Sequence, residues 1–151
     1  MARQKNALRQ HFVAVFNPAS PDTAPQKTDY KLLAKYIKTV NDETDEDTDD
    51  IAYYDGDGTP EEVVVSVKAG FSFEGNYDVE DEAQKLIAGL RYKVGDERKV
   101  WFKVVSSDKK TQWEAVAIAS GIKAGDGDAN EFENFECTLR WVTLPKETAV
   151  V

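Results

Sequence analysis

The chain has 151 residues, which suits a single domain with its own core, and 41% of them are hydrophobic, as in a folded protein. Its formal net charge of -9 excludes general attraction to nucleic-acid phosphates, so we expect a charged partner to be basic. Cys137 is the only cysteine, which excludes a secreted scaffold held by intrachain disulfides. No segment is typical of a signal peptide or a membrane span, and we expect a soluble protein that folds in a reducing cytosol without membrane contact.

The charge is distributed unevenly along the chain. Residues 1–10 form a basic arm without acidic residues, in which Arg3, Lys5 and Arg9 carry the charge. By contrast, NDETDEDTDDIAYYDGDGTPEE, residues 41–62, holds eleven carboxylates and no lysine or arginine. Exposed carboxylates about 6 Å apart repel each other by roughly 0.7 kcal/mol in water, so we expect an extended acidic loop here. If copies of the protein associate, the basic arm of one copy can meet the acids of the next in a salt-sensitive contact.

The first half of the chain is predicted to contain three strands. QHFVAVFN, residues 10–17, predicts the first, and the Pro-rich residues 17–27 predict an extended connection after it. LLAKYIKTV, residues 32–40, predicts a second strand, although its apolar residues also fit a helical stripe. Residues 61–75 predict one long, half-buried strand, because apolar and polar side chains alternate. One face holds Val63, Val65, Val67, Ala69, Phe71 and Phe73, and the other holds Glu62, Ser66, Lys68, Ser72 and Glu74.

The second half is predicted to contain one helix and three strands. The helix runs from Asp78, its N-terminal cap, to Leu90, and its apolar face covers a sheet. Residues 98–120 predict a hairpin that turns at SSDKK, and a final strand over 132–144 follows the loop GDGDANE. The apolar side chains of the helix are Val79, Ala83, Leu86, Ile87 and Leu90, and those of the strands include Val100, Phe102, Val104, Phe135, Cys137, Leu139 and Trp141.

Catalytic residues are scarce in this sequence. His11 is the only histidine, and we expect it to be structural or exposed, without a role in a catalytic triad or a metal site. Cys137 alternates with apolar neighbours in a predicted strand, where a thiol behaves as a small buried hydrophobe. No glycine-rich phosphate loop opens a helix. We therefore expect neither enzymatic activity nor a cofactor.

The density of acidic residues leaves two alternatives open. A calcium loop that starts at Asp45 has Asp50 where glycine is needed and Gly56 where a bidentate glutamate is needed, and a register from Asp126 fails at the same two positions. An irregular calcium site with oxygen ligands stays an alternative. A DNA-mimicking inhibitor of a host enzyme is the second.

Four segments, in this order, resemble the major tail tube proteins of long, non-contractile-tailed bacteriophages. The most specific parts are DGDGTPE, before the predicted long strand, and GDGDANEFENFECTL, before the final one. The resemblance covers nearly the whole chain. The four segments are YYDGDGTPEEVVVSVKAGFSFEG, VEDEAQKLIAGL, RKVWFKVV and WEAVAIASGIKAGDGDANEFENFECTLRWVTLPKE.

This resemblance implies a mainly β subunit, a sandwich or barrel-like domain over residues 1–151 with one flanking α-helix. Such subunits form six-fold rings that stack into a tube for the genome, and each donates strands to an inner barrel. Carried onto this sequence, the N-terminal arm 1–10, the long loop 41–60 and the C-terminal segment 145–151 mediate contacts between subunits and rings. The implied partners are further copies of the chain and the tail terminator, tape measure and distal tail proteins, in a virion tail assembled in the host bacterial cytoplasm.

Charge and resemblance together predict how such a tube works. Ring closure pairs strand edges that would otherwise stay open. Six copies carry a formal charge of about -54, and the part that faces the lumen repels phosphates, so phage DNA passes without specific binding. The candidate lumen face is Glu62, Ser66, Lys68, Ser72 and Glu74, although this row fits an outward face equally well. The residues expected at contacts between subunits and rings are Arg3, Lys5, Arg9, Asp45, Glu46, Asp47, Asp49 and Asp50.

Overall fold

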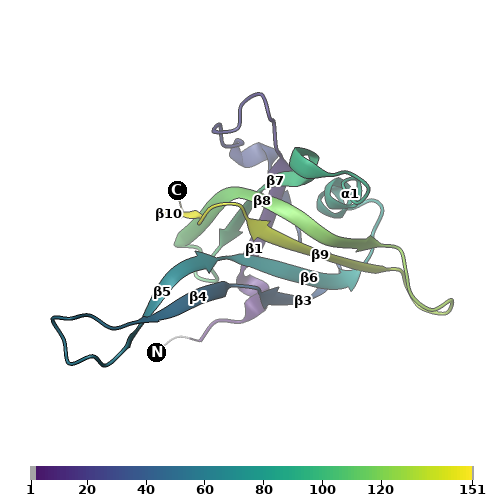
Figure 1. The fold of residues 1–151 in the computed structure, drawn as a ribbon. Helices are drawn as coiled ribbons and strands as arrows, with labels where there is room; N and C mark the ends of the chain where they lie inside the picture. Colours follow the sequence, from purple (N-terminus) through teal and green to yellow (C-terminus); the bar gives the residue numbers. More distant parts are fainter. Residues whose placement is uncertain (1–2, 151) are drawn as a thin grey trace.

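The computed structural model describes residues 3–150 as a mainly β fold with one α-helix, α1 (Glu82–Ala88), which confirms the predicted fold class. Eight strands form one antiparallel sheet in the order β2-β1-β7-β8-β9-β6-β3, with β10 paired to β8, while β4 and β5 form a separate sheet of two strands. The main sheet curls around the core as a half-barrel (Figure 1). The strands are β1 (Gln10–Val15), β2 (Lys31–Leu32), β3 (Ile37–Asp42), β4 (Asp45–Ile51), β5 (Glu61–Lys68), β6 (Gly70–Asn76), β7 (Lys99–Val105), β8 (Thr111–Ala124), β9 (Asn134–Trp141) and β10 (Lys146–Ala149).

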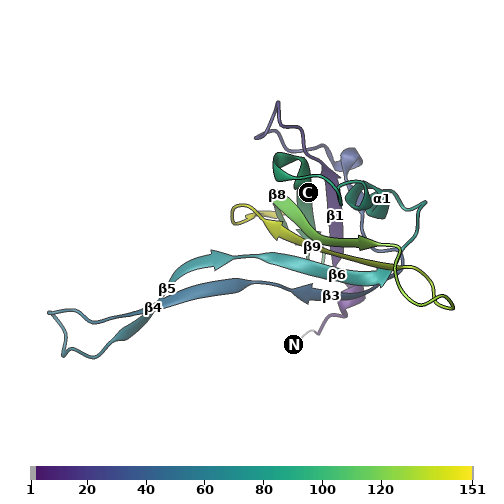
Figure 2. The ribbon, with the colours of Figure 1, turned by 45° about the vertical axis from the view of Figure 1, so that its right-hand side comes forward.

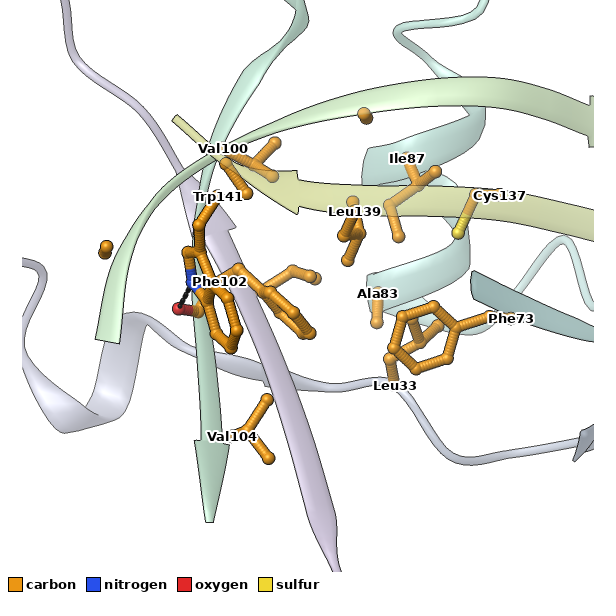
Figure 3. Packing of buried hydrophobic residues seen from close by; sticks show 14 of the residues in the cluster. Leu33, Phe73, Ala83, Ile87, Val100, Phe102, Val104, Cys137, Leu139 and Trp141 are labelled. Carbon is orange, nitrogen blue, oxygen red and sulfur yellow. Dashed lines mark hydrogen bonds between the residues drawn. The ribbon is translucent and has the colours of Figure 1, made fainter. Parts of the chain in front are cut away.

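The concave side of the curled sheet holds the core. Phe102 and Trp141 pack together (Figure 3). Their ring centroids are 4.9 Å apart. The indole Nε1–H of Trp141 donates a hydrogen bond of 3.0 Å to the backbone oxygen of Phe102, so the buried polar group has a partner. The alternating apolar residues predicted for β7 and β9 are all buried, which confirms this hairpin and the late strand.

Strand β7 is buried on both faces, which alternation alone did not predict. Trp101 and Lys103, on the face opposite Phe102, are each only 8% exposed. Trp101 packs with Ala14 and Tyr30 in a second, smaller apolar cluster. Tyr30 belongs to the connection between β1 and β2, so this connection covers the convex side of the sheet there.

Helix α1 closes the core beside β1 and β8, as predicted, but it is shorter than its apolar pattern indicated (Figure 1). Ala83 and Ile87 are buried, whereas Val79 is 63% exposed and lies before the helix. The predicted cap was wrong: the carboxylate of Asp81, not that of Asp78, accepts the backbone N–H of Gln84. Asp78 instead accepts the N–H of Glu80 and pairs with a lysine before β3.

The predicted long strand over residues 61–75 is two strands, β5 and β6, separated by Ala69. The backbone N–H of Trp141 donates to the carbonyl of Ala69 at 2.9 Å. A Cβ on Gly70 would lie 2.6 Å from the Leu139 oxygen, so the chain passes β9 at a distance that only glycine allows. Strand β5 lies outside the main sheet, and Val63 and Val65 are exposed, not half-buried as predicted, whereas Val67 next to the junction is half-buried.

Residues 32–40 differ from expectation, and the C-terminal segment 145–151, of which Val151 lies outside the described residues, contains a strand that was not predicted. The first segment contains parts of two strands, because Tyr36 adopts a positive φ of 61° just before β3 begins. In the second, β10 pairs with the start of β8 in the same chain, with Lys146 opposite Glu114. A role of residues 145–151 in contacts between subunits stays a prediction.

Candidate functional site

Strands β4 and β5 form a hairpin that projects from the body of the domain (Figures 1 and 2). They continue β3 and β6, so a single ribbon runs from the main sheet into solvent. At the junction, the backbone N–H of Glu43 donates to the Gly70 carbonyl at 2.9 Å. Beyond the junction the two strands pack mainly against each other, and the projecting hairpin has no core of its own.

The acidic stretch is a strand of this hairpin, which corrects the prediction of a long loop over residues 41–60. Residues 45–51 form β4, and only the tip between Ile51 and Glu61 is irregular. Pairing with β5 supplies the hydrogen bonds that make an extended acidic segment a strand. Its five acids are nevertheless exposed as predicted, and within residues 3–150 none of them forms an ion pair; they are Asp45, Glu46, Asp47, Asp49 and Asp50.

The extended conformation of β4 bears on the calcium alternative. Successive side chains of a strand point to opposite faces, so Asp49 and Asp50 diverge and do not surround one point. Asp47 accepts a hydrogen bond of 2.9 Å from the Ser66 hydroxyl. In the described part of the chain no three His, Cys, Asp or Glu side chains cluster as metal ligands would. The hairpin geometry therefore gives the calcium alternative no support.

A register shift in the hairpin interrupts the row proposed to face the lumen. Asp47 is paired with Ser66, but the next residue, Thr48, is paired with Val64, so β5 contains a β-bulge. Directly paired residues share a face, which puts Ser66 and Glu62 on opposite faces of the hairpin. The sequence interpretation of one uninterrupted row was therefore wrong for this part.

The other members of that row lie on regular pairs. Lys68 is paired with Asp45, while Ser72 and Glu74 lie in the main sheet opposite Thr138 and Glu136 of β9. A lumenal position for these residues stays a prediction.

The hairpin also exposes apolar side chains, and two of them, Val63 and Val65, were predicted on a half-buried face. Val64 and Val65 are 51% and 56% exposed, and Val63 is 36% exposed. Tyr53 and Tyr54 stand exposed at the tip. A run of exposed valines on a strand with a free edge is unusual for a monomer and typical of an association surface.

The structure describes residues 3–10 of the basic arm, whereas residues 1–2 lie outside the described residues; no basic side chain in residues 3–10 forms an ion pair with the acids of β4. Residues Asn6–Leu8 form a 3-10 helix, and Arg3 and Lys5 are exposed. The Arg9 guanidinium lies 5.6 Å from the centre of the Phe71 ring and donates from Nε to His11 Nε2 at 3.1 Å. The predicted arm and acidic segment are thus not brought together within one chain.

His11 and Cys137 are structural residues, as the sequence predicted. His11 is buried among Phe71, Phe73 and Phe102, and its desolvation, together with the neighbouring Arg9 charge, lowers its pKa to about 4. Its imidazole is therefore neutral at pH 7. Burial raises the pKa of the Cys137 thiol, which keeps it protonated and unreactive.

No family model matches the sequence, and no curated protein matches it. Solved structures of the same fold do exist. A chain from the tail of an empty GTA particle, determined by helical refinement with C6 symmetry, has a TM-score of 0.70 at 13% identity, over 97% of this chain and 100% of that chain. The chain has a tail tube fold. A chain from the virion of the native gene transfer agent (GTA) particle also has a TM-score of 0.70, at 12% identity and with the same coverage.

A third structure with this fold comes from the anti-feeding prophage cap, the AFP tube terminating cap. Its TM-score is 0.56 at 12% identity, over 99% of this chain and 93% of that chain. The tail tube fold thus extends over almost all of the chain. The division of the chain expected from the sequence, one domain over residues 1–151, stays a prediction. No helix in residues 3–150 has both the length and the apolar character needed to cross a membrane.

The hairpin was not predicted, although the sequence contains a local signal for it. Asp55-Gly56 and Asp57-Gly58 stand between the acidic run and the valine run, and Asp-Gly between two extended segments is typical of a hairpin turn. Repulsion between the acids favours an extended conformation, which a strand provides as well as a loop does. The missed residues are the exposed valines and the two tyrosines at the tip.

Proposed function

We propose that the chain is a structural, non-enzymatic subunit of a bacteriophage-type tail tube that assembles with copies of itself into stacked hexameric rings. The observation that carries this proposal is the shared fold with a chain from a C6-symmetric tail, over 97% of this chain. The proposed location is the virion tail. The partners predicted from the sequence, the tail terminator, tape measure and distal tail proteins, belong to the same proposal.

The projecting hairpin supports assembly. Its exposed valines and its free strand edges would be a liability in a permanent monomer, because unpaired edges invite uncontrolled pairing. Contact with neighbouring copies would bury the valines and protect these edges. A head-to-tail contact that closes after six copies gives a ring, and the same surfaces repeated along an axis give a tube.

The net charge supports a channel for DNA. Six copies of a chain with charge -9 would carry about -54 per ring, and a lumen that shares this charge would repel the phosphates of passing DNA. Specific binding of the DNA to the lumen wall would slow its passage. We therefore propose a negatively charged conduit whose wall includes Ser72 and Glu74 on the convex face of the sheet.

Negative-stain electron microscopy of the concentrated full-length protein tests the assembly. We expect rings or tubes of uniform diameter, with six-fold symmetry in end views. Only small particles across a series of salt concentrations would contradict the proposal. Micromolar Ca²⁺ binding in calorimetry, or inhibition of a nucleic-acid enzyme by such small particles, would favour the two alternatives named above.

A further inference from the structure

A cleft on the convex side of the sheet concentrates positive charge in this acidic protein. It has a volume of about 410 Å³ and lies between β1, β7, β8 and the connection that leads to β2. Three lysines line it, Lys27, Lys103 and Lys109, and we call it the lysine cleft. Glu114 is the only acidic residue among its lining residues, and it already accepts a hydrogen bond from the Tyr30 hydroxyl.

Lys103 is the unusual member of this cleft. Lys103 is only 8% exposed, and although Glu114 lies directly opposite it on β8, its ammonium makes no ion pair or hydrogen bond within residues 3–150. The ammonium lies 4.9 Å from the centre of the Phe12 ring and 4.4 Å from that of Tyr30. Aromatic faces hold a cation in place without neutralising it. A buried cation that is held in this way and opens into a cleft is a ready site for a carboxylate.

The hairpin is complementary to this cleft in both charge and polarity. One of its faces carries Asp47 and Asp49, with Val63 directly opposite Asp49. The acids of β4 have no ion-pair partner within the described residues, and the valine is exposed. The cleft offers ammonium groups next to an apolar wall that includes Phe12 and Pro25. The ammonium groups of the cleft can therefore pair with the carboxylates of the hairpin, and its apolar wall can cover the exposed valine.

We propose that the lysine cleft is the docking site for the β4–β5 hairpin of a second copy of this chain, which places the carboxylates of Asp47 and Asp49 on Lys27, Lys103 and Lys109. The hairpin projects away from the body and does not pack on it, so the contact is between copies (Figure 2). The hairpin and the lysine cleft are different surfaces of the chain, so the contact is head-to-tail and can repeat from one copy to the next. This inference rests on the proposed function, because it names the partner surface used in assembly.

Charge reversal with rescue tests the docking. The cleft variant combines Lys27→Glu with Lys109→Glu, since both residues are exposed and outside the core. The hairpin variant combines Asp47→Lys with Asp49→Lys. We expect each variant alone to raise the protein concentration needed for assembly, measured by light scattering and microscopy, by at least about tenfold. Mixing the two variants, or combining all four changes in one chain, should restore assembly.

Matched controls show whether a loss of assembly comes from lost docking, from the change in net charge or from misfolding. Glu46→Lys with Asp50→Lys makes the same charge change on the opposite face of the hairpin, and Lys85→Glu with Lys93→Glu does so at exposed lysines outside the cleft. We expect both controls to assemble within about threefold of the wild-type concentration. Circular dichroism and thermal melting should show the wild-type fold in every variant.

The possible failures are distinguishable. If the wild-type chain forms no rings or tubes, the proposed function itself fails. If the wild type assembles and the cleft variant assembles equally well, or if mixing does not rescue, only the docking proposal is overturned. The docking proposal would also be overturned if the wild type bound a short DNA duplex and the cleft variant did not. The cleft would then be a binding site for DNA phosphates.

Discussion

Strands β5 and β6 are adjacent in sequence and have a similar alternation, but their surroundings differ. Phe73 of β6 is 2% exposed, because β6 lies between β3 and β9 and faces the core. Val65 of β5 is 56% exposed, because β5 pairs only with β4 and has no sheet or helix beside it. The comparison teaches that alternation predicts a strand with two distinct faces, whereas burial depends on what lies next to that strand.

The largest difference between the two regions should appear on truncation of apolar side chains. Phe102→Ala removes a fully buried ring that contacts Trp141 and should lower the free energy of unfolding by about 3–5 kcal/mol. Val65→Ala in the hairpin should change it by less than about 0.5 kcal/mol in the monomer. Urea denaturation of the unassembled protein measures both. Equal losses would show that the hairpin is part of the folded core.

The junction between the two strands should be the next most sensitive place. Gly70→Ala puts a methyl group 2.6 Å from the Leu139 oxygen and 2.7 Å from the Arg140 Cα, both backbone atoms, and should cost about 3 kcal/mol. Gly89→Ala is the matched control, because its nearest neighbours would be 3.4 Å and 3.5 Å away and its φ is -65°. Gly89→Ala should leave the free energy of unfolding unchanged or raise it slightly. A tolerated Gly70→Ala would contradict the close approach of β6 to β9.

Acid should weaken the body through His11. Its pKa is about 4 in the folded protein and about 6.5 in the unfolded chain, so the unfolded state binds the proton more readily. This contribution to stability is fully present above pH 6.5 and is lost as the pH falls toward 4. Between pH 7 and pH 5 we expect a loss of about 2 kcal/mol in the free energy of unfolding.

The variant His11→Phe isolates this contribution. It keeps a ring among Phe71, Phe73 and Phe102 but cannot bind a proton, so its stability should depend less on pH over the same range. Urea denaturation at pH 7, 6 and 5 compares the two proteins. An identical pH dependence would show that the imidazole is not desolvated.

Neutralising the acids of β4 should have the smallest effect on the stability of the monomer. Its effect on assembly should be large. Changing Asp45, Glu46, Asp47, Asp49 and Asp50 to Asn or Gln should alter the unfolding free energy by less than about 1 kcal/mol, because all five are exposed. Ring stacking, or its dependence on salt, should change. Light scattering across a salt series detects this, and an unchanged assembly curve would refute a role of these acids in stacking.

The sequence predicted the body better than the hairpin for a physical reason. Residues such as Phe102 and Leu139 alternate with polar ones and meet neighbours from the same chain, so the pattern and the burial agree. In β5, the alternation shows two faces but not that a bulge between Ser66 and Val64 exchanges them. The β-bulge depends on local backbone geometry, which the alternation pattern does not contain.

The sequence predicted the negative charge of the candidate site but not the hairpin and cleft that shape it. The exposed acids of β4 follow from composition alone, whereas repulsion between them predicts an extended segment and does not indicate that it pairs with β5. The lysine cleft combines residues of three strands, a turn and a connection, such as Lys27 and Lys109, which only the folded chain brings together. No local pattern joins positions so far apart in sequence.

A cryo-electron microscopy reconstruction of the assembled protein tests the central claim, that the hairpin lacks a core of its own because another copy of the chain covers it. We expect a six-fold assembly in which Val63, Val64 and Val65 are buried against a neighbouring subunit and the acids of β4 face lysines. An assembly in which every hairpin points freely into solvent would contradict it.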